Sequence, residues 1–294
     1  MANSIVPIRV GVAGFDYKDW RGTVYPAKWP RGFDPLRYLA DYIDVMEINS
    51  SFYGPPTEST TRKWLARVRD VPDFHFTAKL WKRFTHERKE PWTRDEADLV
   101  HAGLAPMMEH GKLDALLLQF PWSFKNNEAS MEWLGDIVNE FSEFPLVVEV
   151  RHETWNNPSF YQWLTDNGAG FVNIDQPLFS KSIKPSATTT AHHGYVRVHG
   201  RNYKDWFRKD AGRDARYNYL YEPKELKKWV KRTEDVAEQP ATSEVSVVFN
   251  NHYKGQAVTN AIQFKSIAMK EKVPAPVQLM ETFREALARY AVPG

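Results

Sequence analysis

The chain has 294 residues, a length that is ordinary for one α/β barrel, and we expect a single domain over residues 1–294. Its formal net charge of +2 argues against a protein that binds polyanions through overall charge. It contains no cysteine, which excludes disulfides, thiolate nucleophiles and cysteine-based metal sites.

Nothing in the sequence predicts export or membrane insertion. The first ten residues, MANSIVPIRV, lack a charged leader followed by a long apolar run, so no secretory signal is predicted. No apolar stretch approaches the ~20 residues that a transmembrane helix requires. We therefore expect a cytoplasmic protein.

Short apolar runs that predict strands alternate along most of the chain with patterns that predict helices. The predicted strands cover 8–14, 44–50, 74–80, 113–120, 145–151, 170–175, 194–200 and 244–251. The predicted helices cover 35–42, 58–71, 94–110, 128–141, 158–167, 223–237, 256–268 and, at the C-terminal end, 280–290. Alternation of this kind predicts right-handed crossovers and a parallel sheet, and eight units predict a parallel eight-stranded (β/α)8 TIM barrel.

The sixth connection departs from this pattern. Residues 176–193 are rich in proline, serine and threonine and show no helical periodicity. We therefore expect the sixth helix to be irregular or missing. An open doubly wound sheet is the alternative architecture.

The predicted strands begin apolar and become polar at their C-terminal ends, whereas parallel strands are usually apolar throughout. Residues two apart share a face of a strand. Active sites of TIM barrels lie at the C-terminal ends of the strands. Counting by two along the strands predicts that one site is formed by Glu47, Asn49, Lys79, Gln119, Glu149, Arg151, Asp175, Arg197, His199 and Asn250.

A purely structural role for these residues is the alternative. Three carboxylates could neutralise three cations, Lys79, Arg151 and Arg197, in a buried network. Removing one partner of such a network costs ~3–5 kcal/mol. We favour a ligand site because polar strand ends recur in the same phase on seven strands.

Two stretches, 79–94 and 201–216, combine basic and aromatic residues. The second includes Trp206 and follows the seventh strand, where TIM barrels often bind phosphate. Cations interleaved with aromatic rings suit a sugar phosphate or single-stranded nucleic acid. We expect this stretch to overhang the barrel mouth, and a solvated loop is the alternative. The sequence contains no Walker loop and no G-x-G-x-x-G fingerprint.

A metal site has only weak support. Glu47, Glu149, Asp175 and His199 offer oxygen and imidazole ligands suited to Mg²⁺, Mn²⁺ or Zn²⁺. However, the cations predicted at the same site compete for these carboxylates, and no H-x-H or H-E-x-x-H pair is present. We predict neither a metal nor another cofactor.

The sequence resembles the family called domain of unknown function 72, the YecE-like proteins. The resemblance is carried by the motifs E-I-N-S-S-F-Y (47–53), L-L-L-Q-F-P (116–121), E-V-R-H-x-x-W (149–155), Y-V-R-V-H-G (195–200) and F-N-N-H-Y-x-G-x-A-V-x-N-A (249–261). It implies a TIM barrel but no particular reaction. Besides residues already named, it implies that Tyr53, His152, Trp155 and Gly200 belong to the site.

These observations predict an enzyme that acts on a small polar, anionic substrate, such as a phosphorylated sugar or a nucleotide derivative. Hydrolase, lyase and isomerase activities remain open. We expect Glu47 or Glu149 to transfer protons with a pKa raised by an aromatic-lined pocket. Among the carboxylates, only Glu149 and Asp175 lie on neighbouring strands, as glycoside hydrolysis would require. The alternative is a non-catalytic protein that binds RNA or single-stranded DNA through its basic and aromatic loops.

Overall fold

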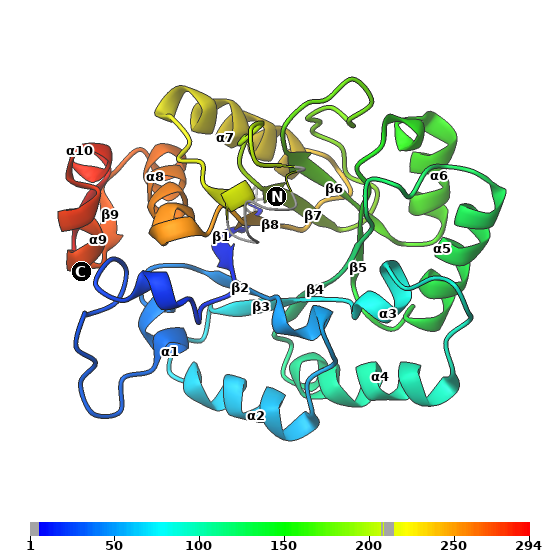
Figure 1. The fold of residues 1–294 in the computed structure, drawn as a ribbon, viewed down its shortest axis with the longest axis horizontal. Coiled ribbons are helices and arrows are strands. Elements are labelled where there is room, and N and C mark those ends of the chain that lie inside the picture. Colours follow the sequence, from blue (N-terminus) through cyan, green and yellow to red (C-terminus); the bar gives the residue numbers. More distant parts are fainter. Residues whose placement is uncertain (1–5, 207, 209–214) are drawn as a thin grey trace, which may run out of the picture.

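The computed structural model describes residues 6–206, 208 and 215–294. Its centre is a closed barrel of eight parallel strands in sequence order, as predicted (Figure 1). The barrel strands are β1 (Ile8–Ala13), β2 (Val45–Ile48), β3 (His75–Lys79), β4 (Leu113–Gln119), β5 (Leu146–Glu149), β6 (Gly170–Asp175), β7 (His193–Val198) and β8 (Glu244–Phe249). The open-sheet alternative is therefore wrong, because β1 pairs with both β2 and β8.

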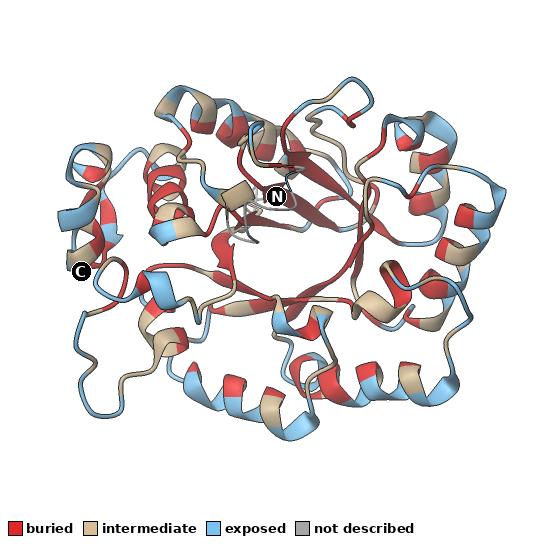
Figure 2. Ribbon diagram, viewed as in Figure 1, coloured by how far each residue is buried: buried red, intermediate tan, exposed pale blue. Residues whose placement is uncertain are grey.

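Helices surround the barrel and bury the faces that they turn toward it (Figure 2). They are α1 (Pro35–Leu39), α2 (Glu58–Arg67), α3 (Lys82–Thr85), α4 (Arg94–Glu109), α5 (Glu128–Glu140), α6 (Pro158–Asp166), α7 (Pro223–Ala237) and α8 (Gln256–Met269). Short 3-10 turns η1 (Lys18–Trp20), η2 (Ser50–Phe52), η3 (Glu153–Trp155), η4 (Ala215–Tyr217) and η5 (Tyr253–Gly255) lie in the connections. None of the helices in the described ranges combines the length and apolar character needed to cross a membrane.

Local sequence signals explain where several helices begin. Thr93 and Glu96 form a capping box at the start of α4, in which each side chain bonds the other residue's backbone N–H. The Asn157 side chain caps α6, and Pro158 occupies its first turn, where no N–H is needed.

The connection between β6 and β7 contains no helix, as predicted. Asn173 on β6 fixes this segment instead. Its amide nitrogen donates to the Thr188 carbonyl at 2.8 Å, while its Oδ1 accepts from the Thr188 N–H at 2.8 Å and the Ser186 hydroxyl at 2.7 Å. The polar side chain of Asn173 on the outer face of β6 therefore replaces the apolar contacts that a helix between β6 and β7 would make.

The prediction of one terminal helix over 280–290 is wrong. The structure has two short helices, α9 (Val277–Thr282) and α10 (Arg284–Leu287), separated at Phe283, whose φ of −113° and ψ of 42° are not helical. The strand β10 (Ala291–Pro293) follows and pairs with β9 (Val273–Ala275) in a small parallel sheet outside the barrel. The apolar pattern of this segment reflects packing on both short helices and cannot distinguish them from one longer helix.

An ion-pair cluster closes the N-terminal end of the barrel. Arg9 on β1 donates to Glu244 on β8 at 2.6 Å, and the same guanidinium lies 3.4 Å from Asp114 on β4. His75 on β3 lies 2.6 Å from Asp114, which gives its ring a polar partner. His193 begins β7, one residue before the predicted strand, and lies 3.1 Å from Glu244.

We expect this cluster to weaken in acid. The hydrogen bond with His193 lowers the pKa of Glu244, and the bond from Arg9 adds to this against the opposing effect of burial, so the pKa falls from 4.5 to about 2. A carboxylate with a depressed pKa stabilises the fold above pH 4.5, and this contribution is lost as the pH falls toward 2.

The measurement is urea unfolding at several pH values. As the pH falls from 4.5 to 2, the free energy of unfolding of the wild type should decrease by ~1–2 kcal/mol more than that of Glu244→Gln, because glutamine does not titrate. The exposed Glu109→Gln variant serves as the control and should follow the wild type. Identical pH profiles for the wild type and Glu244→Gln would contradict the assignment.

Candidate active site at the mouth of the barrel

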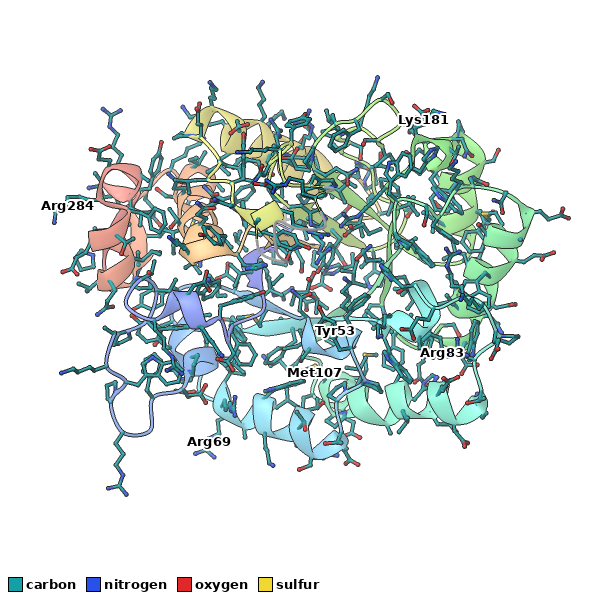
Figure 3. All side chains as sticks on the ribbon, in the orientation of Figure 1. Tyr53, Arg69, Arg83, Met107, Lys181 and Arg284 are labelled. Atoms are coloured by element: carbon teal, nitrogen blue, oxygen red, sulfur yellow. The ribbon has the colours of Figure 1, made fainter. Side chains whose placement is uncertain are left out.

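A cavity of about 660 Å³ opens at the C-terminal ends of the strands. Most of its polar lining comes from residues at, or just after, the ends of strands. Eight of the residues predicted for the site line it: Asn49, Tyr53, Lys79, Gln119, Arg151, Arg197, Trp206 and Asn250. Tyr53, whose side chain is labelled in Figure 3, is exposed and directly follows η2.

Arg197 on β7 forms the floor of this cavity. Its Nε and Nη2 donate to the two carboxylate oxygens of Glu47 on β2 at 2.9 and 2.6 Å, and its Nη1 donates to Glu149 on β5 at 2.8 Å. All three side chains are buried. One guanidinium therefore joins two carboxylates across the barrel, and neither glutamate lines the cavity.

A second group of contacts saturates the other oxygen of Glu149. Oε1 accepts from Arg151 Nη2 at 2.7 Å and lies 3.1 Å from Nε2 of His199. The amide nitrogen of Asn250 lies 3.0 Å from Nδ1 of His199. Because the Asn250 amide donates to Nδ1, the neutral imidazole carries its proton on Nε2 and donates it to Glu149.

The pKa of Glu149 does not fit the proton-transfer role predicted for it. Burial alone would raise the pKa of Glu149, but nearby positive charge outweighs burial and holds this pKa well below its ordinary value. At neutral pH that charge comes from Arg197 and Arg151, because burial lowers the pKa of His199 to about 3 and leaves its ring neutral. The expectation of a raised carboxylate pKa is therefore wrong for Glu149.

Lys79, at the end of β3, has a different environment. Its Nζ lies 3.9 Å from the centre of the Phe52 ring, and no described carboxylate lies within ion-pair distance of it. Burial lowers the pKa of Lys79, the nearby Arg197 charge lowers it further, and Glu47 and Glu149 oppose this only in part, so the pKa falls to about 7. Lys79 thus presents an amine that is readily deprotonated at neutral pH.

Asp175 does not belong to this cavity. Ile174 pairs in register with Arg197, and Asp175 pairs with Val198, so Asp175 points to the outer face of β6. There it accepts from Nε and Nη2 of Arg201 at 2.9 Å each. The predicted common phase is wrong for β6, and a Glu149–Asp175 pair cannot straddle a substrate bond.

Three residues implied by the family motif, His152, Trp155 and Gly200, also lie outside the cavity lining. Trp155 is fully buried, stacks on Phe124 and donates its indole N–H to the Phe124 carbonyl at 2.7 Å. His152 is buried edge-on against Trp122, with ring centres 4.9 Å apart. Since Trp122 lines the cavity, His152 supports its wall from behind.

Several lining residues were not singled out from the sequence. They include His86, Trp122 and His252. Each follows a strand at some distance, where the alternation of side chains no longer indicates direction. His252 lies within the family motif over 249–261, which could have identified it. The predicted overhang at 201–216 lies partly outside the described residues, although Trp206 and Arg216 line the cavity.

The described part of the chain contains no cluster of three or more His, Asp or Glu side chains arranged to hold a metal ion. Of the four ligands considered from sequence, Glu47 and Glu149 are engaged by guanidinium groups, and Asp175 faces the other side of the sheet. The donor set therefore does not suit a divalent cation.

The closed parallel barrel and its polar C-terminal mouth define a TIM-barrel protein. The family described as "Protein of unknown function DUF72" matches residues 9–282, and the chain belongs to this family.

A curated relative, the UPF0759 protein YunF of Bacillus subtilis, is 28% identical over 270 residues, which cover 87% of this chain and 93% of the relative. A crystal structure of a DUF72 family protein from Thermotoga maritima is 32% identical and covers 90% of this chain and 100% of that one, with a TM-score of 0.76. One from Enterococcus faecalis is 23% identical, covers 89% of this chain and 95% of that one, and shares the fold with a TM-score of 0.76.

Proposed function

We propose that the protein is an enzyme that binds a small anionic substrate at the barrel mouth and transfers protons there. One observation carries the proposal. Among the described residues, the lining holds four cations, Lys79, Arg151, Arg197 and Arg216, and one carboxylate, Asp16, and even with the buried Glu47 and Glu149 beneath it the cations outnumber the carboxylates by one. Such a lining attracts negative charge into a partly desolvated space, where electrostatic interactions are stronger than in water.

The contacts indicate different roles for the glutamates and for Lys79. Glu47 and Glu149 orient the guanidinium groups of Arg197 and Arg151 from below, so these groups are fixed before a ligand arrives. Lys79, with a pKa of about 7, is the group suited to exchange a proton at neutral pH. This differs from the role predicted from sequence, in which Glu47 or Glu149 transferred protons.

Aromatic rings complete the cavity. Phe52, Tyr53, Trp122 and Trp206 lie in its lining, and the Arg151 guanidinium lies 5.7 Å from the centre of the Trp206 ring. Asn49, by contrast, offers an amide for a ligand hydroxyl or carbonyl. A small substrate with an anionic group and either a planar or a sugar-like body would be complementary to this lining.

The nucleic-acid alternative has less support, because several of the described cations in the basic stretches are paired with carboxylates. In the first stretch, Lys82 lies 2.6 Å from Glu87 and Arg83 lies 2.7 Å from Glu96. Arg201, at the start of the second, is bound to Asp175. Phosphate contacts need cations that are free to replace counterions.

A binding screen with Arg151→Met tests the proposal. Phosphorylated and carboxylated small molecules are titrated into the wild type by calorimetry, and the tightest ligand is then titrated into the variant. Losing one charge-assisted contact should weaken binding by about 10- to 100-fold. Arg62→Met, an exposed variant on α2, is the matched control and should bind like the wild type.

Two outcomes would contradict the proposal. One is tight ligand binding that Arg151→Met leaves unchanged while circular dichroism shows the fold intact. The other is the absence of any anionic ligand together with salt-dependent binding of mixed-sequence RNA, which would favour the nucleic-acid alternative.

A further inference from the structure

The amine of Lys79 differs in its surroundings from the amines of the lysines that form ion pairs. Lys82, Lys231 and Lys265 each lie 2.6–2.8 Å from a carboxylate oxygen. Lys79 instead extends from a strand end into the cavity, with an aromatic ring against its Nζ and no described carboxylate within ion-pair distance. A cation held for structural reasons would have a carboxylate partner in such a setting.

The backbone around Lys79 is fixed. The Ser51 hydroxyl, which is buried, lies 2.7 Å from the Lys79 carbonyl and 2.7 Å from the Ile48 carbonyl, and so ties the end of β3 to the end of β2. The lysine side chain therefore starts from a rigid position at the mouth. Precise placement of one reactive group by the scaffold is a requirement of covalent catalysis.

Arg151 and Arg197 line the same cavity as Lys79 and are held by Glu149 and Glu47. They supply fixed positive charge beside the amine. Positive neighbours and a desolvated setting keep an amine neutral and hence nucleophilic, as the pKa of about 7 for Lys79 indicates. An anionic group on a ligand would be drawn to the guanidinium groups, which places the rest of the ligand near Nζ.

We propose that Lys79 forms a Schiff base with a small aldehyde or ketone that carries a phosphate or carboxylate group. The lone pair of Nζ attacks the carbonyl carbon, and a proton moves from nitrogen to the carbonyl oxygen. That oxygen takes a second proton from solvent and leaves as water. The product is an iminium ion that keeps one proton and the positive charge on nitrogen.

This inference rests on the proposed anion-binding function and names its substrate class, a carbonyl compound with an anionic substituent. The iminium withdraws electrons from the adjacent carbon, which favours loss of a proton or cleavage of a carbon–carbon bond there. The lyase and isomerase classes are therefore favoured over hydrolysis.

Three matched probes test the inference on the full chain. Pyridoxal 5′-phosphate has both an aldehyde and a phosphate, pyridoxal lacks the phosphate, and pyridoxine 5′-phosphate has an alcohol in place of the aldehyde. Each is incubated with the protein at pH 7, borohydride is added to reduce any imine to a stable secondary amine, and the labelled lysine is located by peptide mass spectrometry. Binding of pyridoxine 5′-phosphate is measured separately by calorimetry.

We expect pyridoxal 5′-phosphate to label Lys79 in preference to the other lysines. Measured relative to the labelling of exposed lysines by the same probe, pyridoxal should label Lys79 at least about tenfold less efficiently than pyridoxal 5′-phosphate, because one charge-assisted contact is missing. Lys79→Arg should lose this label while still binding pyridoxine 5′-phosphate, since arginine keeps the charge without a nucleophilic amine. Lys63→Met, an exposed variant on α2, should be labelled at Lys79 like the wild type.

The possible failures are distinguishable. Pyridoxine 5′-phosphate binding that Arg151→Met weakens, together with labelling spread over surface lysines, would overturn the Schiff-base proposal and leave the anion cavity standing. Equal labelling of Lys79 by pyridoxal and pyridoxal 5′-phosphate, with no binding of pyridoxine 5′-phosphate, would overturn the anion cavity and retain a reactive lysine. If Lys79 is not labelled and pyridoxine 5′-phosphate does not bind, both proposals are overturned.

Discussion

Replacing Arg197 with methionine should lower the free energy of unfolding by about 3–5 kcal/mol. Arg197 is 1% exposed, and its guanidinium donates to Glu47 at 2.6 and 2.9 Å and to Glu149 at 2.8 Å. Methionine fills a similar volume but leaves two buried carboxylates facing each other without the intervening charge. Breaking a buried ion network by removing one partner is costly, because the remaining charges cannot regain the hydration that they have in the unfolded chain.

The measurement is urea unfolding at pH 7, followed by fluorescence and circular dichroism. Arg62→Met provides the matched control. Arg62 also pairs with two carboxylates, Glu58 at 2.8 Å and Glu109 at 3.1 Å, but its side chain is 46% exposed. This control should change stability by less than about 1 kcal/mol. Equal, small losses in both variants would show that Arg197 does not hold the centre of the barrel together.

Lys79→Met should have the opposite effect and stabilise the protein at neutral and lower pH. Because burial and the Arg197 charge lower the pKa of Lys79 from 10.5 to about 7, the folded protein resists protonation of this amine more than the unfolded chain does. Between pH 7 and 10.5 the unfolded chain binds more protons, so wild-type stability should rise with pH over this interval. Below pH 7 the wild type carries the full destabilisation.

The gain from Lys79→Met should therefore exceed about 1.4 kcal/mol at pH 6, the equivalent of one pKa unit, and decrease as the pH approaches 10. Subtracting the two pH profiles removes the titrations that both proteins share. Lys63→Met, at an exposed position, should show no such pH-dependent gain. A Lys79→Met protein that is less stable than the wild type at pH 6 would mean that the lysine supports the fold.

Taken together, these two variants separate structure from function within one cavity. Arg197 is saturated by carboxylates and should stabilise the fold, whereas Lys79 has no described carboxylate partner and should destabilise it. Functional groups are commonly maintained at some loss of stability, so a stabilising substitution at Lys79 would agree with a role in ligand chemistry.

Much of the fold could be predicted because the relevant signals are local. Strand character, helix caps and the proline-rich sixth connection each lie within a short window of sequence. The C-terminal helix was mispredicted because two short helices and one longer helix share the same apolar pattern, and only the backbone at Phe283 separates them.

The site was predicted less completely because its decisive features are not local. Alternation correctly indicated the inward face for Glu47, Lys79 and Glu149, but it misplaced Asp175, whose direction depends on the register between β6 and β7. The roles of the glutamates could not be read from sequence either. Glu47 and Arg197 are 150 residues apart along the chain, and only the closed barrel brings them within 2.6 Å.

A crystal structure with inorganic phosphate bound tests the central claim most directly. An anion-binding cavity at the barrel mouth predicts phosphate within hydrogen-bond distance of the Arg151 guanidinium and the Lys79 amine, above an unbroken Glu47–Arg197–Glu149 arrangement. Phosphate bound only at exposed surface cations, with the cavity holding water alone at saturating concentration, would contradict it.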